Sequence, residues 1–348
     1  MKRTCFLFLL FALLMSGCRF RGTKDPVDAS HAFPDGQISL GGVIAEQLSD
    51  FNRPDSSRIY RVSLVAGKIK QLQDQSEELK ENDESAVLES FYRDWQDTKE
   101  KIRDHFEYLS EDDLKAWVSL NDSLLKYSGE VRFADELEKM IYSAPVPEVI
   151  SEEMIKSFCY SRLYDRIYVN VYGSSAVEYE HTTGGRVRIF QDTKYPYDGR
   201  IKIKVELQDT RYLDLFIRIP QWSDQASVRV KGVMYNVVPG EYAEVARRWE
   251  NGDEVDIVLG MRPEVVRRYS TGLAFIYGPL FLSYVPGKGD TLTFKGSDPT
   301  GHLQLVSPPG EMPTFTFSGI PQEPLVLQPF FAEQEEPGTR TAWIRTSH

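Results

Sequence analysis

The spacing of hydrophobic residues changes near Asp165, and this change most constrains the fold. From about Arg58 to Tyr160 apolar residues recur at helical intervals, whereas after Asp165 they alternate with polar residues. The clearest alternation is RIKIKVEL (200–207), in which the aliphatic side chains face one way and the charged ones the other. The sequence therefore predicts an α+β protein, with a helical domain followed by an antiparallel β-sandwich.

The helical half carries its own start and stop signals. Ser110 followed by Asp113 is typical of a helix N-terminus, and Gly129 is typical of a helix end. A second helix is expected next, with Phe133 on its inner face. The acidic stretch QLQDQSEELKENDES (71–85) has no histidine neighbours, so we interpret it as a solvated helix face and not as a metal site.

The first eighteen residues indicate an export signal. Lys2 and Arg3 precede an apolar run, Cys5–Met15, that is too short for a permanent membrane span. Small residues directly before Cys18 match a bacterial lipobox, which predicts that Cys18 is acylated. The protein would then be anchored in the bacterial cell envelope, facing the periplasm or the cell surface. The alternative is a plain signal peptide that happens to contain a cysteine.

Composition shifts along the chain predict its domain organisation. The polar start of the mature chain contains two prolines and is expected to be a tether. Short strands with turn signals continue after the sandwich and indicate a β extension. The expected parts are the signal (1–18), the tether (19–37), the helical domain (38–165), the β-sandwich (166–285) and the C-terminal β extension (286–348).

Charge and cysteine content limit the possible partners. The chain has 52 acidic and 41 basic residues, a formal charge of −11, and this excess repels nucleic acid. Cys159 has no disulfide partner, because Cys5 leaves with the signal and Cys18 is capped. A lone cysteine is either a working nucleophile or metal ligand, or a small apolar residue in a core. We favour buried packing, which is usual for free cysteine.

Five motifs in the second half occur in the order of one known family. They are IYVNVYGSS (167–175), QDTKYPYDGRIKIKV (191–205), RIPQW (218–222), VPGEYAEVARRWENGDEVDI (238–257) and YGPL (277–280). On these motifs the chain is similar to glycoside hydrolase family 127, whose members resemble β-L-arabinofuranosidases. The resemblance covers the non-catalytic β-sandwich of that family.

The helical half resembles only the edges of that family's (α/α) toroid. The stretch 117–144 resembles a late helical pair of the toroid, and ISLGGVIAEQL (38–48) resembles its first segment. The interval between the tether and the first expected sandwich strand is much too short for a complete toroid. The resemblance therefore implies a shortened helical domain. The apolar helix faces that an incomplete toroid exposes would either repack or be covered by a protein partner.

The resemblance also implies a metal site, which this sequence does not reproduce. In the family, a cysteine nucleophile is held as a thiolate by zinc, which a glutamate and two further cysteines also bind, with a separate glutamate as acid/base. The matching positions here are Asp113, Lys115, Ser143 and Ala144. A lysine ammonium repels zinc, so we expect no zinc or other cofactor, and we name no catalytic residue.

Three aromatic residues in the resembling motifs are candidates for stacking on sugar rings. They are Trp222, Tyr195 and Tyr197. The alternative for each is packing at a strand end.

Together these features predict an exported family 127-like lipoprotein. We expect a catalytically degenerate accessory or binding protein whose partners are plant or microbial glycans. One alternative is an active glycosidase with a rebuilt active site, which would need a pocket lined by two facing acids. Another is a structural protein that binds nothing.

Overall fold

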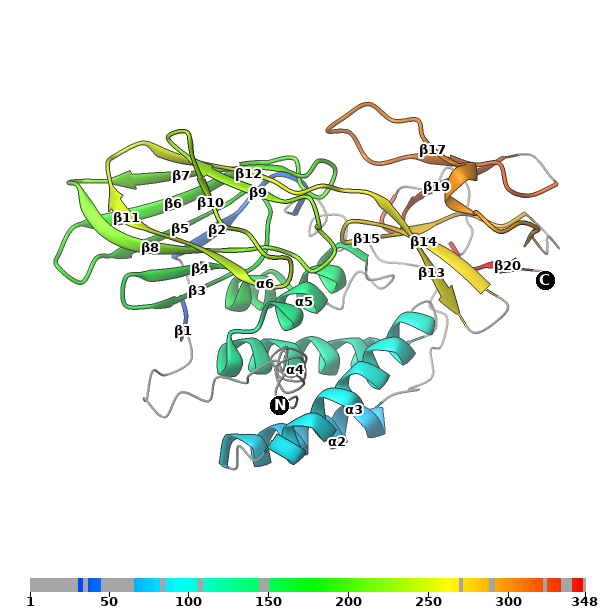
Figure 1. The fold of residues 1–348 in the computed structure, drawn as a ribbon. Helices are drawn as coiled ribbons and strands as arrows, with labels where there is room; N and C mark the ends of the chain where they lie inside the picture. The colour runs from blue at the N-terminus through cyan, green and yellow to red at the C-terminus, as the bar shows by residue number, and fades with distance from the viewer. Residues whose placement is uncertain are drawn as a thin grey trace, which may run out of the picture.

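The structure is a computed structural model that forms three parts. Helices lie at the bottom of Figure 1, a two-sheet β-sandwich lies above them, and a third β-sheet lies beside the sandwich. The helical layer therefore runs beneath both β parts. The described residues are 31–33, 37–44, 66–81, 85–105, 109–143, 150–268, 272–287, 292–321, 324–332 and 340–346.

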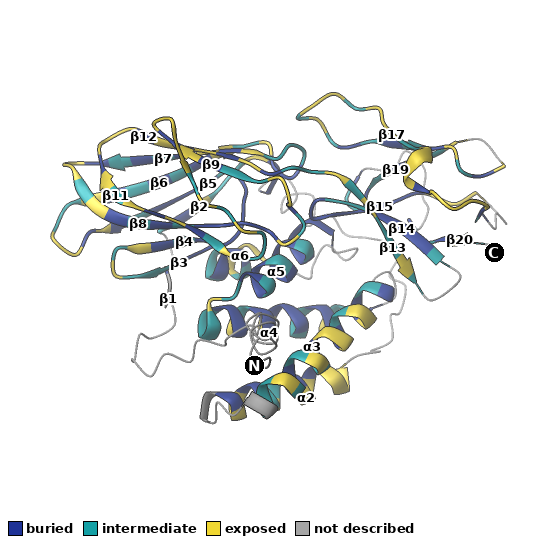
Figure 2. Ribbon diagram, in the orientation of Figure 1, coloured by how far each residue is buried: buried dark blue, intermediate teal, exposed yellow. Residues whose placement is uncertain are grey.

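The helical part is built in layers. The outer helices α2 and α3 expose one face, whereas α4 and α5 are buried between the outer helices and the β parts (Figure 2). The tryptophan rings of Trp95 and Trp117 stack with centroids 5.8 Å apart, which joins α3 to α4. The bounds are α2 (Ala66–Glu81), α3 (Ser85–Asp104), α4 (Glu111–Ser128), α5 (Val131–Ser143) and α6 (Glu152–Cys159).

Helix α4 begins and ends where its sequence signals predict. The Ser110 hydroxyl accepts a hydrogen bond from the Asp113 backbone N–H at 3.1 Å, which satisfies one free donor of the first turn. Gly129 has φ of 67° and donates its N–H to the Leu125 carbonyl. Only glycine adopts this backbone conformation without strain, so both predicted helix signals are confirmed.

The β-sandwich consists of a five-stranded and a seven-stranded sheet. The five-stranded sheet has the order β1 (His31–Ala32), β3 (Tyr160–Leu163), β4 (Arg166–Val169), β8 (Arg211–Arg218) and β11 (Tyr242–Trp249). The seven-stranded sheet has the order β10 (Val233–Tyr235), β9 (Ser227–Val230), β12 (Asp253–Val258), β7 (Arg200–Leu207), β6 (Arg186–Thr193), β5 (Ser175–Glu180) and β2 (Ile38–Leu40).

Strand β7 shows why the alternating pattern sets the sandwich. Ile201, Ile203 and Val205 are buried against the opposite sheet, whereas Lys202 is exposed. The predicted half-buried strand is confirmed, and the α+β fold class with a shortened helical region and a β-sandwich is confirmed with it.

The third sheet contains eight strands. Strand β15 of this sheet packs against α5 and is buried on both faces. The strands of the sheet are β13 (Pro263–Arg268), β14 (Gly272–Tyr277), β15 (Leu280–Ser283), β16 (Thr293–Phe294), β17 (Leu303–Leu305), β18 (Phe315–Phe317), β19 (Leu325–Pro329) and β20 (Ile344–Thr346).

The strand pairing departs from the expected domain boundaries. Strands β2 and β3, expected within the helical domain, pair with β5 and β4 in the two sandwich sheets. Strands β13 to β15, expected in the sandwich, belong to the third sheet. Strands β2 and β3 have only three and four residues, which show too little alternation to be assigned to a sheet from sequence.

The outer faces of the described helices are polar. The exposed large hydrophobic residues in the described part of the chain lie on strands and turns and not on α2 to α6. The expectation of a protein partner depends on uncovered apolar helix faces, and the described helices present none.

The predicted export signal and Cys18 lie outside the described residues. No helix within the described ranges has the length and apolar character needed to cross a membrane.

Candidate functional site

The residues at the positions that the resemblance assigns to the metal site make other contacts. Lys115 has a half-exposed side chain that pairs with Glu111 one helical turn earlier. Asp113 is buried in the first turn of α4. Ala144 lies outside the described residues. The lysine ammonium therefore points into an ion pair on the surface of α4 and has no lone pair to offer a metal.

Ser143 uses its hydroxyl to join α5 to the third sheet. Its Oγ donates to the Pro279 carbonyl at 2.7 Å and accepts from the Phe281 N–H at 2.9 Å. The side chain is 1% exposed. Both hydrogen bonds hold the turn between β14 and β15 against the end of α5, so Ser143 has a structural task.

The crevice beside Ser143 is small. Lys99 and Lys139 both bind one carboxylate oxygen of Glu136 there, at 3.1 and 2.9 Å. The cavity volume is about 20 Å³, about the room needed for one water molecule. A sugar ring does not fit this crevice.

The described residues do not fit the zinc of the resembling family. None of them forms a group of three or more histidine, cysteine, aspartate or glutamate side chains able to hold a metal. A surface ammonium and a hydroxyl with two hydrogen bonds stand where the resemblance places thiolates. These two side chains supply no thiolate that could bind zinc.

Cys159 is buried at the end of α6, as the sequence predicts. Its side chain is 2% exposed, and burial raises the pKa of the thiol to about 12. A cysteine nucleophile needs a thiolate near neutral pH. Cys159 therefore packs as a small apolar residue, and the packing interpretation is confirmed.

The three aromatic candidates differ in exposure. Tyr195 has no exposed surface, and its ring packs edge-on against Tyr142 and Tyr172 with centroids 5.6 and 5.7 Å away. Burial favours the packing alternative for Tyr195, because a sugar cannot reach the ring. Tyr197 is half-buried and stacks on Phe331, and Trp222 packs half-buried against the core. The structure does not bring the three together on one surface.

A buried ion cluster that the sequence reasoning missed joins α5 to the sandwich. Arg218, on β8, has no exposed surface and donates to Asp135 and Glu138 of α5. Asp135 also accepts the Gln221 N–H at 3.0 Å. Arg218 is the first residue of the RIPQW motif. A charged residue at the end of an alternating strand is the signal that could have indicated this cluster.

The cluster holds more negative than positive charge. Burial raises the pKa of Glu138, opposed by the Arg218 guanidinium, and the neighbouring Asp135 adds to the rise. The hydroxyl of Tyr142 donates to the Tyr172 carbonyl at 2.5 Å, beside the cluster. Because Asp135 and Glu138 both hold the same guanidinium, the cluster stabilises the junction and offers no free acid and base pair.

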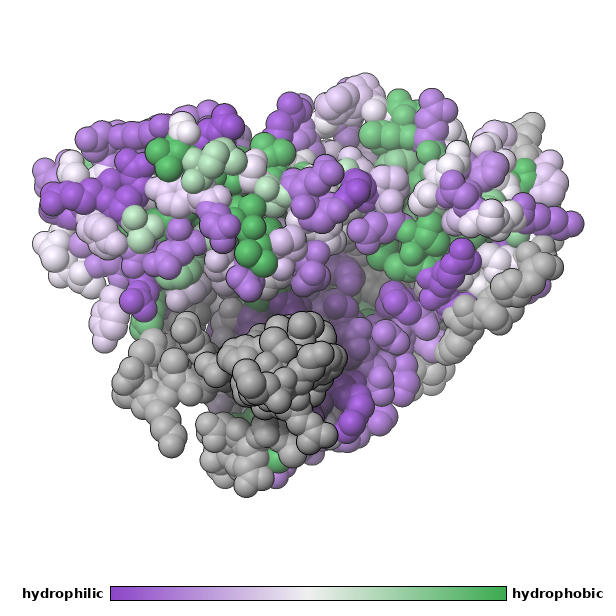
Figure 3. All heavy atoms as spheres, in the orientation of Figure 1, coloured by the Kyte–Doolittle hydropathy of each residue, from purple (hydrophilic) through white to green (hydrophobic). Residues whose placement is uncertain are grey.

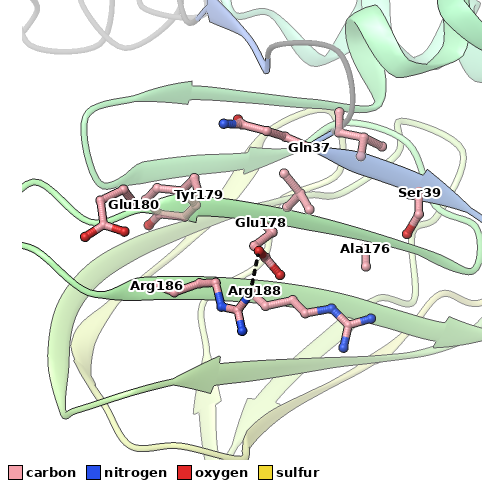
Figure 4. A pocket seen from close by; sticks show the side chains of 10 residues that line it. Gln37, Ser39, Ala176, Glu178, Tyr179, Glu180, Arg186 and Arg188 are labelled. Carbon is pink, nitrogen blue, oxygen red and sulfur yellow. Dashed lines mark hydrogen bonds and ion pairs between the residues drawn. The ribbon is translucent and has the colours of Figure 1, made fainter.

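The large cavities lie on the outer face of the seven-stranded sheet. One has a volume of about 490 Å³ and is lined by residues of β2, β5 and β6 (Figure 4). In this view Gln37 and Ser39 lie along one side, Arg186 and Arg188 along the other, and Glu178 between them. A second hollow of about 400 Å³ shares Glu178 and both arginines and continues toward β7.

Ion pairs between strands order the charged side chains of these hollows. Arg186 binds Glu178 at 3.0 Å, and Arg188 binds Glu206 at 3.2 Å. Lys204 binds the second oxygen of Glu206 at 2.9 Å. In the orientation of Figure 1, the surface of the sandwich is mostly hydrophilic, with hydrophobic residues in separate small groups (Figure 3).

The fold and these surfaces define a class of protein in which a helical part supports a two-sheet β-sandwich and a further β-sheet. Residues 166–261 match the family model of the β-L-arabinofuranosidase GH127 middle domain. The chain is therefore related to glycoside hydrolase family 127 through this domain. No curated protein sequence matches the chain.

Solved structures share the fold at low sequence identity. One described as a glycoside hydrolase is 17% identical with a TM-score of 0.56, covering 68% of this chain and 52% of its own. A GH127 β-L-arabinofuranosidase from Geobacillus stearothermophilus T6 is 18% identical with a TM-score of 0.54, covering 67% and 49%. A GH127 β-arabinofuranosidase is 19% identical with a TM-score of 0.57, covering 69% and 50%. The chain thus spans about half the length of these structures.

Proposed function

We propose that this chain is a saccharide-binding accessory protein related to glycoside hydrolase family 127 that does not itself hydrolyse glycosides. The observation that carries the proposal is the crevice beside Ser143. Its volume is about 20 Å³, and the serine hydroxyl is held by two hydrogen bonds. A substrate ring has no room at the position where the resemblance places a metal-bound thiolate.

The state of Cys159 supports the same proposal. Among the residues that the structure describes, Cys159 is the only cysteine, and burial raises the pKa of its thiol to about 12. A thiol of this kind carries almost no thiolate at neutral pH, so it supplies no nucleophile.

An active glycosidase with a rebuilt site is the alternative. A retaining mechanism needs two carboxylates about 5 Å apart at a cavity that admits the sugar. Asp135 and Glu138 share one face of α5, but both bind the guanidinium of Arg218, which leaves neither available. This arrangement favours the binding role.

Turnover and metal content test the proposal. The full chain is purified in a detergent without a sugar headgroup and incubated with aryl L-arabinofuranosides and related glycosides. Zinc or a chelator is added in parallel, and bound zinc is measured by elemental analysis. We expect no hydrolysis above the blank and much less than one zinc per chain. Hydrolysis that a chelator abolishes would overturn the proposal.

We also propose that the protein is exported and held in the cell envelope by a lipid on Cys18. The support is the basic start, the apolar run Cys5–Met15 and the small residues before Cys18. Metabolic labelling with an alkyne fatty acid should mark the wild-type chain and leave Cys18→Ala unlabelled. Equal labelling of Cys159→Ala and wild type is the matched control, and labelling of Cys18→Ala would contradict this proposal.

A further inference from the structure

We propose that the hollow on the outer face of the seven-stranded sheet binds a neutral oligosaccharide. This inference rests on the proposed saccharide-binding function and names the site and the ligand class. The site is centred on Gln37, Ser39, Glu178, Arg186 and Arg188.

Small residues at the end of the sheet create the hollow. Ser39 on β2 and Ala176 on β5 are directly opposite each other in the antiparallel register. Longer side chains surround them, with Arg186 and Arg188 on β6 and Gln37 before β2 (Figure 4). The depression arises because short side chains lie between long ones on one face of a pleated sheet.

One buried polar atom of the hollow has no hydrogen-bond partner within the described part of the chain. It is the amide oxygen of Gln37. The Tyr179 ring, in contrast, lies on the inner face of the sheet against Phe33 and Arg162. Buried polar atoms are satisfied in most native structures, by protein, water or ligand. A ligand hydroxyl donating to Gln37 would satisfy this oxygen.

Ion pairs order the hydrogen-bond donors and acceptors of the hollow before any ligand binds. Arg186 and Arg188 are held by Glu178 and Glu206 on neighbouring strands. The guanidinium groups have donors beyond those used in the ion pairs, and the carboxylates have further lone pairs. A pair of adjacent sugar hydroxyls both donates and accepts, so it complements such a row without requiring these side chains to be ordered on binding.

Charge balance selects a neutral ligand. The two adjoining hollows are lined by three cations, Arg186, Arg188 and Lys204, and by three anions, Glu178, Glu180 and Glu206. The lining therefore has no net formal charge, although the chain carries −11. An acidic sugar would face the unpaired acidic excess of the whole chain.

Size and an aromatic ring complete the complementarity. Volumes of about 490 and 400 Å³ fall within the range of small-molecule sites, about 300–1,000 Å³. Phe190 lies on the same face, half-buried between Ala176 and Lys204, with the Arg188 guanidinium 5.7 Å from its ring centroid. Its ring offers apolar surface to the C–H groups of a sugar.

Titration calorimetry with defined probes tests the inference. The probes are α-1,5-linked arabinotetraose and xylotetraose as neutral oligosaccharides and tetragalacturonate as an acidic one. Each is titrated into the full chain in a detergent without a sugar headgroup. We expect the neutral probes to bind more tightly than the acidic one.

Two variants change the site without removing a hydrogen bond that the fold needs. Gln37→Met removes an amide oxygen with no partner in the described residues, and Arg188→Gln leaves Glu206 paired with Lys204. Each should weaken binding at least about tenfold, which is about 1.4 kcal/mol, while the melting temperature stays close to wild type. The matched controls are Gln304→Met, at an exposed position of β17, and Arg229→Gln, on the outer face outside the hollows. Both should bind as wild type.

The outcomes separate this inference from the proposed function. Binding that both variants leave unchanged would place the saccharide elsewhere, which overturns the site but keeps the function. Tighter binding of tetragalacturonate would overturn the neutral ligand class. Absence of binding by every probe at about 10 mM, weaker than a standard free energy of about −3 kcal/mol, would overturn both.

Discussion

Arg218 of β8 donates through its guanidinium to Glu138 of α5, and both side chains are almost fully removed from solvent. This ion pair joins residues separated by 80 positions and connects the sandwich to the helical part. A second carboxylate, Asp135, holds the other guanidinium nitrogen. One cation thus binds two carboxylates of α5 at the junction between the two parts.

Replacing that cation should strongly destabilise the protein. Arg218→Met keeps an unbranched apolar stem but leaves Glu138 buried and unpaired, which typically costs about 3–5 kcal/mol. Urea unfolding followed by circular dichroism measures the loss. Lys202→Met, on the exposed face of β7, should change stability little. Equal stability of Arg218→Met and wild type would show that the junction is held by other contacts.

The Ser143 hydroxyl should contribute to stability and not to catalysis. Ser143→Ala leaves the Phe281 N–H and the Pro279 carbonyl without their partner. The expected loss is about 1–3 kcal/mol in the free energy of unfolding. Ser123→Ala, at an exposed position of α4, is the control and should change little. A neutral Ser143→Ala variant would contradict the structural role.

Glu136 should make stability depend on pH at the acidic end. Burial alone would raise the pKa of Glu136, but Lys139 and Lys99 lower it to about 2. A carboxylate with a lowered folded pKa stabilises the fold above its unfolded pKa, and the contribution disappears as the pH falls toward the folded value. The Glu136 contribution should therefore decrease by about 2 kcal/mol between pH 7 and pH 3.

Glu136→Gln isolates this effect. The variant should lose less stability than wild type between pH 7 and pH 3, measured by urea unfolding at each pH. Glu89→Gln, on the exposed face of α3, should retain the wild-type dependence. Identical pH dependence of Glu136→Gln and wild type would refute the assignment.

The Cys159 thiol should be unreactive in the folded protein. Burial raises its pKa to about 12, so almost no thiolate exists at pH 8. In a Cys5→Ala, Cys18→Ala background, a chromogenic disulfide reagent should react only after denaturant is added. Rapid reaction of the folded chain at pH 8 would contradict the burial of this residue.

The sequence predicts features that depend on neighbouring residues. The start of α4 at Ser110, its end at Gly129 and the alternation along β7 all follow from local rules, and the structure confirms each. The motif resemblance likewise concerns continuous stretches, and the family model covers 166–261.

Features that join distant segments could not be predicted. Strand β2 is only three residues long, so its place at the edge of the seven-stranded sheet has no periodic signal. The partners of Arg218 lie 80 or more residues away. For Tyr195 the sequence left sugar stacking and packing open, and the contacts of its ring with Tyr142 and Tyr172, on other segments, show that it packs.

Binding without turnover is the central claim, and one nuclear magnetic resonance time course tests both parts. The full chain is mixed with α-1,5-linked arabinotetraose, and saturation transfer to the sugar is recorded together with the anomeric signals over several days. The account predicts saturation transfer that Gln37→Met diminishes, with anomeric signals that stay constant. New reducing-end signals that grow faster than in a protein-free sample would contradict it.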